Sequence, residues 1–193
     1  LHKRILKKME GIEKEYGRFN KIEGHGKIGI ITSGASYNYI KEIDPKGVKI
    51  AKLNITNPIS KKFISRFLKG LKSVIVVEEL EPFIEDFVKE VALEANPKIK
   101  IYGKDILPRV GEFNQDIIAC ALAKAKIKVV APNIQKQSKE TGKIKIPVRY
   151  PDFCKGCPHV FTFDNLKTAL GPDTIWVGDI GCYSMGLFEP YNM

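Results

Sequence analysis

Three cysteines and a histidine near the carboxyl end of the chain have the residue types and spacing for chemistry. Cys154 and Cys157 are separated by two residues, His159 follows them, and Cys182 comes after a predicted strand. Two thiolates at this spacing can bind one metal because the turn between them directs both sulfurs inward. Gly156 lets that turn close. These residues predict a site of metal or thiol chemistry.

Spacing alone leaves four interpretations of these residues open. A structural zinc site would use the three cysteines and the histidine. An iron–sulfur cluster would take the three cysteines and a fourth ligand from elsewhere. A redox dithiol of the thioredoxin type should open a helix in the first βα unit of a small domain, whereas this pair follows a linker. In the fourth interpretation the cysteines lie unligated in a turn and a loop.

A glycine-rich turn precedes Cys182. The run Gly178-Asp179-Ile180-Gly181 follows the predicted strand 174–177 and combines small residues with a carboxylate. Such a turn allows close approach of a diphosphate or a heterocycle. Near the start of the chain, Ser33-Gly34-Ala35-Ser36 is similar to an anion-binding turn, and ordinary helix capping explains it equally well.

Alternating strands and helices position these residues. Strands are predicted at 28–31, 48–53, 74–77 and 98–102, and helices at 35–43, 60–70, 83–91 and 114–125. This alternation predicts an α/β fold with a doubly wound, mostly parallel sheet. Glu78, Glu79 and Glu81 end a strand and begin a helix, and we favour stabilisation of that helix N-terminus over catalysis.

Four segments are predicted along the chain. Residues 1–25 form a connecting helix and linker, 26–132 the α/β domain, and 133–146 a second linker. Residues 147–193 begin a second α/β domain that stays incomplete, because one strand and one helix cannot bury a core. The first and last residues, Leu1 and Met193, predict an interior fragment of a larger protein.

Composition restricts the class of protein. The net charge is +10, but its lysines are spread along nearly every segment. A nucleic-acid-binding protein would cluster this charge and interleave aromatic residues, so we expect no nucleic-acid partner. No stretch approaches the roughly 20 apolar residues of a membrane span. Four cysteines with one closely spaced pair suit the reduced cytoplasm better than a secreted disulfide framework.

Several motifs in order resemble the α subunit of indolepyruvate:ferredoxin oxidoreductase, a thiamine-diphosphate-dependent enzyme. The resemblance covers nearly the whole chain. It departs at Lys155, where the family usually has proline, and at Val160, where a basic residue is common. Its transketolase-C-terminal-like domain resembles Lys27–Gly34, Ser36–Tyr39, Val76–Pro82 and Gly111–Asn114, and the start of its thiamine-diphosphate-binding domain resembles Cys154–His159 and Gly178–Tyr183.

The resemblance implies oxidative decarboxylation of aryl pyruvates, with coenzyme A as acyl acceptor and ferredoxin as electron acceptor. It also implies a β subunit as partner. An iron–sulfur cluster would lie near the cofactor on Cys154, Cys157 and Cys182, which favours the cluster over zinc. The residues implied in binding thiamine diphosphate with magnesium are His159, Gly178, Asp179, Ile180, Gly181 and Tyr183.

Three parts of the family have no counterpart in this sequence: the activating glutamate with its domain, the magnesium motif and the ferredoxin-like domain. We therefore expect no catalytic residue in this chain and no activity from the chain alone. The alternative interpretation is a non-catalytic α/β docking subunit with a zinc-bound Cys/His tail.

Overall fold

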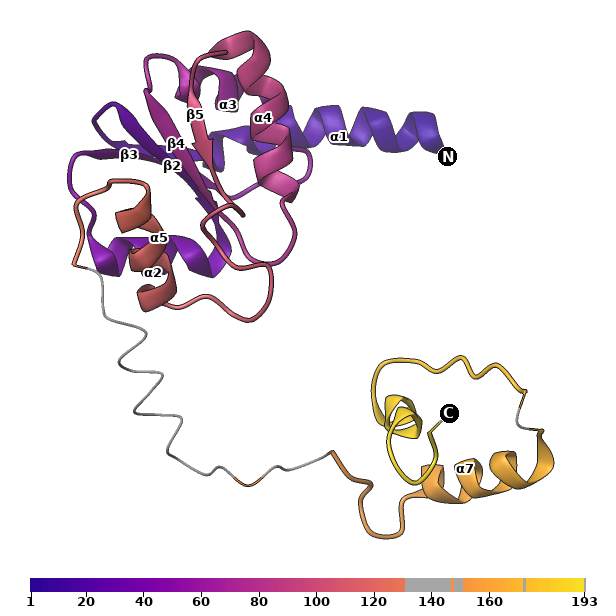
Figure 1. Ribbon diagram of the computed structural model, residues 1–193. Helices are drawn as coiled ribbons and strands as arrows, with labels where there is room; N and C mark the ends of the chain where they lie inside the picture. Colours follow the sequence, from indigo (N-terminus) through magenta and orange to yellow (C-terminus); the bar gives the residue numbers. More distant parts are fainter. Residues whose placement is uncertain (131–146, 148–150, 172, 193) are drawn as a thin grey trace. The chain divides into compact units, whose positions relative to one another are not determined.

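The computed structural model describes residues 1–130, 147, 151–171 and 173–192 (Figure 1). The chain divides into two compact units, Leu1–Lys139 and Glu140–Met193. The predicted linker 133–146 lies outside the described residues. No described helix is both long enough and apolar enough to span a bilayer.

The first unit is built on a five-stranded sheet with strand order β1-β3-β2-β4-β5. Strands β2 to β5 run parallel, and β1 pairs with β3 in the antiparallel direction. The predicted mostly parallel sheet is confirmed. The strands are β1 (Lys21–Gly24), β2 (Ile28–Ser33), β3 (Val48–Leu53), β4 (Ser73–Val77) and β5 (Lys100–Tyr102).

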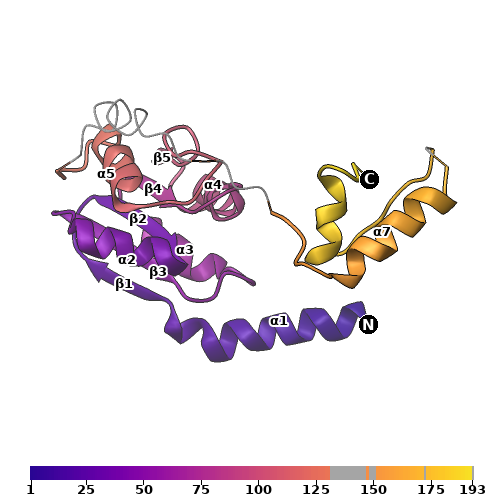
Figure 2. The same ribbon diagram turned by 90° about the horizontal axis from the view of Figure 1, so that it is seen from below.

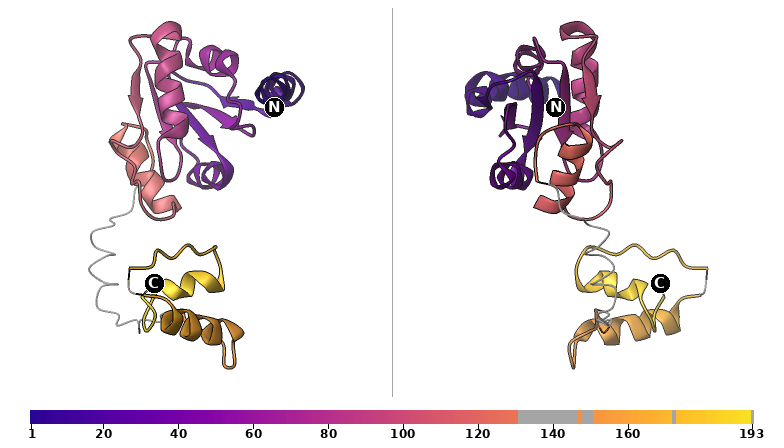
Figure 3. Two further views of the ribbon diagram at one scale, coloured as in Figure 1. Left: turned by 90° about the vertical axis from the view of Figure 1, so that its right-hand side faces the viewer. Right: turned by 60° about the vertical axis from the view of Figure 1, so that its left-hand side comes forward.

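Helices cover both faces of this sheet (Figures 1 and 3). Helices α3 (Lys61–Leu68) and α4 (Phe83–Ala95) pack together on one face, and α2 (Gly34–Ile43) and α5 (Gln115–Lys124) on the other. The predicted doubly wound arrangement is thus present in the first unit.

Strand β4 shows why the sheet lies between two helical layers. Val74 and Val76 belong to the apolar core beneath α3 and α4, whereas Ile75 and Val77 belong to the core beneath α2 and α5. All four side chains are fully buried. A continuous β-branched run is typical of a parallel strand covered on both faces. Burying each such side chain stabilises the fold by about 1.5–3 kcal/mol.

The N-terminal segment differs from its prediction as a connecting helix and linker. Helix α1 (His2–Tyr16) and the short 3-10 helix η1 (Gly17–Phe19) are followed by β1, whose four residues pair with β3. Strand β1 has no fully buried residue, so its sequence carries no strong alternation of apolar and polar residues. As an edge strand it takes its order from backbone hydrogen bonds to β3, which a local pattern does not reveal. Helix α1 buries no residue and extends away from the sheet (Figure 2).

The second unit contains helix α7 (Pro158–Ala169) and the 3-10 helix η2 (Cys182–Leu187). Phe153, Phe163 and Tyr191 pack together, with ring centroids 5.1–5.9 Å apart. The one helix expected in residues 147–193 is confirmed as α7.

The strand predicted at 174–177 is not formed. Ile175 and Val177 are 89% and 93% exposed, and the segment pairs with no other strand among the described residues. The prediction was wrong because high β-propensity orders a strand only where a neighbouring strand accepts its backbone hydrogen bonds.

Candidate functional site

A tight turn carries the cysteine pair. The backbone N–H of Cys157 donates to the carbonyl oxygen of Cys154 at 3.0 Å, and Gly156 has a φ of +74°. This φ lies in the left-handed region that glycine adopts without steric cost. Cys157 then precedes α7, which begins with Pro158. Cys154 is exposed and Cys157 half-buried.

His159 connects this turn with the glycine-rich segment. Its Nδ1 lies 3.3 Å from the Sγ of Cys157. Its ring also contacts the ring of Tyr183, with centroids 4.7 Å apart and an interplanar angle of 77°. The motifs around Cys157 and Tyr183, some 25 residues apart in the sequence, therefore meet at His159.

A cavity of about 580 Å³ lies beside η2. Of the predicted cofactor-binding residues, Gly178, Asp179, Ile180 and Tyr183 line it. His159 contacts the wall through Tyr183. The sequence did not single out the rest of the wall, because apolar residues on a cavity wall follow the same pattern as core residues. Those residues are Phe163, Leu166, Trp176, Val177, Ser184, Gly186 and Leu187.

Two glycines shape this cavity. Gly181 has φ +131° and ψ −147°, a conformation open essentially only to glycine. At Gly186, a Cβ atom would lie 2.9 Å from the ring of Phe163, so only glycine lets η2 pack this closely against α7. The Asp179 carboxylate accepts a hydrogen bond from the N–H of the next residue, Ile180, at 2.7 Å, and this bond helps to order the turn that both residues belong to.

Cys182, the remaining predicted metal ligand, is the first residue of η2 and is exposed. Among the described residues, no group of three or more His, Cys, Asp or Glu side chains is arranged to hold a metal ion. Cys182 is thus not joined with Cys154 and Cys157 into such a group, and the assignment of these thiols to a metal stays a prediction.

The glutamates after β4 have structural roles. Glu78 is buried and accepts hydrogen bonds from the N–H groups of Ile84 and Glu85 at 2.7 and 2.8 Å, which caps α4. Burial raises the pKa of the Glu78 carboxyl, while these two N–H groups act in the opposite direction. Glu79 accepts from the N–H of Phe113 at 2.7 Å. The predicted stabilisation of the helix N-terminus is confirmed for Glu78.

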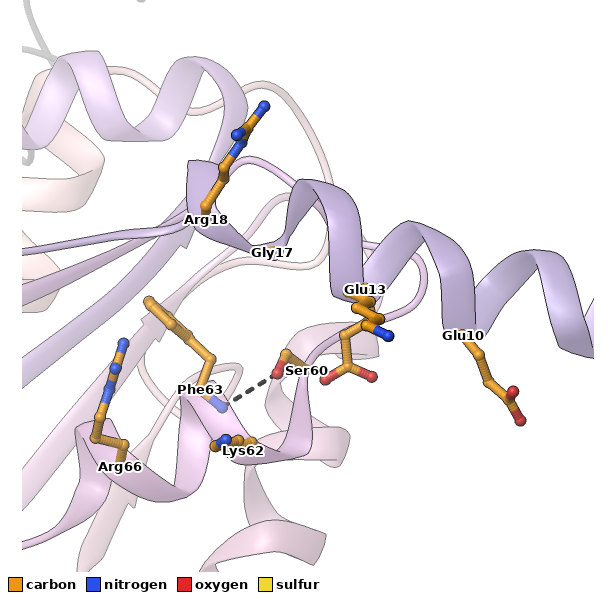
Figure 4. Close-up of a pocket in the computed structure, with 9 residues that line it drawn as sticks. Glu10, Glu13, Gly17, Arg18, Ser60, Lys62, Phe63 and Arg66 are labelled. Carbon is orange, nitrogen blue, oxygen red and sulfur yellow. Dashed lines mark hydrogen bonds between the residues drawn. The ribbon is translucent and has the colours of Figure 1, made fainter.

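A further cavity, of about 470 Å³, lies between α1 and α3 (Figure 4). Charged side chains of both signs line it, including Glu13, Arg18 and Arg66. Ser60 forms the N-cap of α3 there, and its Oγ accepts from the N–H of Phe63 at 3.2 Å. None of the predicted site residues lines this cavity.

Comparison with known proteins relates nearly the whole chain to one group. No family model matches the sequence. Indolepyruvate oxidoreductase subunit IorA from Thermococcus kodakarensis is 38% identical over 98% of this chain and 31% of its own length. The subunits of the same name from Archaeoglobus fulgidus and Methanothermobacter thermautotrophicus are 32% and 31% identical. They are matched over 96% and 100% of this chain, and over 31% and 33% of their own lengths.

A solved 2-oxoglutarate:ferredoxin oxidoreductase from Magnetococcus marinus is 19% identical with a TM-score of 0.44, over 65% of this chain and 23% of that one. The chain spans about a third of the length of the curated relatives it matches. Nearly the whole chain is therefore related to indolepyruvate oxidoreductase subunits IorA, and it corresponds to about one third of their length.

Proposed function

We propose that this chain forms part of an indolepyruvate:ferredoxin oxidoreductase and contributes one wall of its thiamine diphosphate site. The observation that carries the proposal is the cavity beside η2, which Gly178, Asp179, Ile180 and Tyr183 line together. Similarity to IorA subunits over 98% and 100% of this chain supports the same assignment.

The residues of this cavity fit part of the cofactor. The Asp179 carboxylate is exposed, and carboxylates are the ligands that Mg²⁺ takes beside a diphosphate. Trp176, Tyr183 and Leu187 supply aromatic and apolar surface of the kind that binds a heterocycle. Bound thiamine diphosphate would supply the electron sink for decarboxylation of the 2-oxoacid.

The chain's own residues would then position and shield the cofactor. His159 holds Tyr183 through their ring contact, and Tyr183 is part of the cavity wall. The conformation of Gly181 fixes the turn that carries Asp179. We assign no catalytic residue to this chain.

The iron–sulfur cluster on Cys154, Cys157 and Cys182 is a separate part of the proposal. The described arrangement does not fit a cluster, since these thiols do not form a metal-holding group. Cys182 would have to move to the pair, and a fourth ligand would have to come from elsewhere. Anaerobic purification tests this part: stoichiometric iron and sulfide would support the cluster, whereas colourless protein with bound zinc would contradict it.

The partners follow from the same proposal. We assign aryl pyruvate and coenzyme A as substrates, and a β subunit and ferredoxin as protein partners in the cytoplasm. The net charge of +10 would attract an acidic ferredoxin. The alternative of a non-catalytic docking subunit is not favoured, because the relatives are oxidoreductase subunits.

A titration of the chain with thiamine diphosphate and Mg²⁺ tests the central proposal. Trp176 is the sole tryptophan and lines the cavity, so its fluorescence reports on occupancy. We expect a saturable change that Asp179→Asn weakens about tenfold, the loss of one charge-assisted contact. Asp173→Asn, an exposed aspartate outside the cavity wall, is the matched control. No saturable change, or equal binding by Asp179→Asn, would contradict the proposal.

A further inference from the structure

A smaller cavity, of about 280 Å³, lies in the first unit at the carboxyl edge of the sheet. It is bounded by the residues after β2 and after β4, two neighbouring parallel strands. Strand β2 lies between β3 and β4 in the sheet. The chain first goes from β2 through α2 to β3 on one side, and the later strand β4 lies on the opposite side of β2. Open α/β sheets bind ligands at such a reversal of strand order. We propose that this cavity binds a free α-amino acid with an aromatic or bulky aliphatic side chain.

The N-terminus of α2 would bind the carboxylate of the ligand. Its N-cap residue, Ser33, makes no side-chain capping bond, and Gly34, Ala35 and Ser36 of the first turn line the cavity. First-turn N–H groups have no intrahelical acceptor and carry a positive partial charge. They therefore leave donors for an anionic group.

Two hydroxyls at this point have no hydrogen-bond partner among the described residues, which supports a ligand here. Ser36 lines the cavity and is only 5% exposed, yet no hydrogen bond joins its hydroxyl to another described residue. Four residues earlier, at the end of β2, Thr32 is fully buried and its Oγ1 also lacks a partner within the described chain. Buried polar groups are normally hydrogen-bonded. A ligand carboxylate would give the Ser36 hydroxyl the acceptor it lacks.

Two carboxylates on the opposite wall argue against a simple anion as the ligand of this cavity. Both oxygens of Glu78 already accept N–H groups of α4. Glu79 is exposed and uses Oε1 for the N–H of Phe113, which leaves Oε2 for a cation. A phosphate would be repelled by this pair. An α-amino acid avoids the repulsion, because its ammonium group faces Glu79 while its carboxylate faces α2.

The remaining wall is apolar. Phe83 lines the cavity and is 63% exposed, with Ile84 beside it. An exposed aromatic ring at the mouth of a polar cavity fits an apolar side chain of the ligand. The volume of about 280 Å³ accommodates one amino acid.

Calorimetric titration of the 193-residue chain with L-phenylalanine tests the proposal. We expect saturable binding, with 3-phenylpropanoate and 2-phenylethylamine each at least about tenfold weaker because each lacks one charged group. Ser36→Ala should weaken binding about fivefold through the loss of one hydrogen bond.

Glu79→Gln keeps an acceptor for the Phe113 N–H and removes only the charge, so about tenfold weaker binding is expected. Glu90→Gln, an exposed glutamate of α4 outside the cavity wall, should bind as the unmodified chain does. Circular dichroism melts would establish that each variant is folded.

Three results would overturn the proposal: no saturable heat with L-phenylalanine or L-leucine, equal binding of 3-phenylpropanoate, or equal binding by folded Ser36→Ala and Glu79→Gln. Asp179 lies in the other unit, so Asp179→Asn should leave this binding unchanged. Failure here would therefore be distinct from failure of the thiamine diphosphate site.

Discussion

The rings of His159 and Tyr183 meet nearly at right angles, 4.7 Å apart between centroids. Through this contact the cysteine turn and the cavity wall become one local structure, although α7 and the residues that follow it separate them in sequence. The contact predicts that changes at Tyr183 affect both the stability of the second unit and its cavity.

Tyr183→Ala should destabilise the second unit by about 0.5–1.5 kcal/mol, the usual value of an aromatic pair. The same change should weaken the proposed binding of thiamine diphosphate, because Tyr183 lines the cavity. Urea unfolding followed by Trp176 fluorescence measures the first effect. Tyr183→Phe keeps the ring and should behave as the unmodified chain; equal loss in both variants would contradict the role of the ring.

Gly26→Ala should destabilise the first unit by more than about 2 kcal/mol. Gly26 has φ +140°, and a Cβ atom there would lie 2.2 Å from the carbonyl oxygen of Gly47. Gly11→Ala is the matched control, because nothing lies within 4 Å of its Cβ position in α1. It should raise helix stability by about 0.5–1 kcal/mol. Chemical denaturation followed by circular dichroism separates the two outcomes.

The stability of the first unit should depend on the ionisation of Glu78. Burial raises the pKa of this carboxyl above its unfolded value of 4.5, so the folded state holds the proton more tightly than the unfolded state. The stability contributed by this difference is present below pH 4.5 and is lost as pH rises through the folded pKa.

Glu78→Gln should remove this pH dependence. The free energy of unfolding, measured in urea from pH 4 upward, should fall more steeply in the unmodified chain than in the variant. Parallel curves for the two proteins would show that Glu78 does not titrate in this way.

Ile175→Lys should reduce self-association of the chain. Ile175 and Val177 are exposed on a segment that forms neither helix nor strand, and backbone without hydrogen-bond partners is a template for pairing with another chain. Leu93→Lys, on α4, makes a similar change where the helix satisfies its own backbone. Light scattering, measured at increasing protein concentration, should be lower than that of the unmodified chain for Ile175→Lys only. An equal fall for both variants would indicate a charge effect instead.

The fold of the first unit follows from local sequence wherever burial leaves a local pattern. The β-branched run of β4 and the one-sided apolar face of α3 both predict the elements that form. Strand β1 was missed because its hydrogen bonds come from β3, about 30 residues away. The strand predicted at 174–177 failed for the complementary reason, since its residues favour a sheet and have no partner.

The candidate site was predictable only in part. Small residues around a carboxylate identified Gly178 and Asp179, which do line the cavity. Trp176 and Phe163 were not singled out, because nothing in a linear pattern separates the wall of a cavity from the interior of a core. The role of His159 as a contact between Cys157 and Tyr183 depends on how α7 and η2 pack, which the sequence does not specify.

Glu78 and Glu79 are neighbours in sequence, yet they hold opposite sides of the sheet. Glu78 binds the start of α4, whereas Glu79 binds Phe113, which packs in the core beneath α2 and α5. The turn after β4 therefore links the two helical layers mechanically. We therefore expect a displacement of α4 to act on this turn through Glu78, and on Phe113 through Glu79.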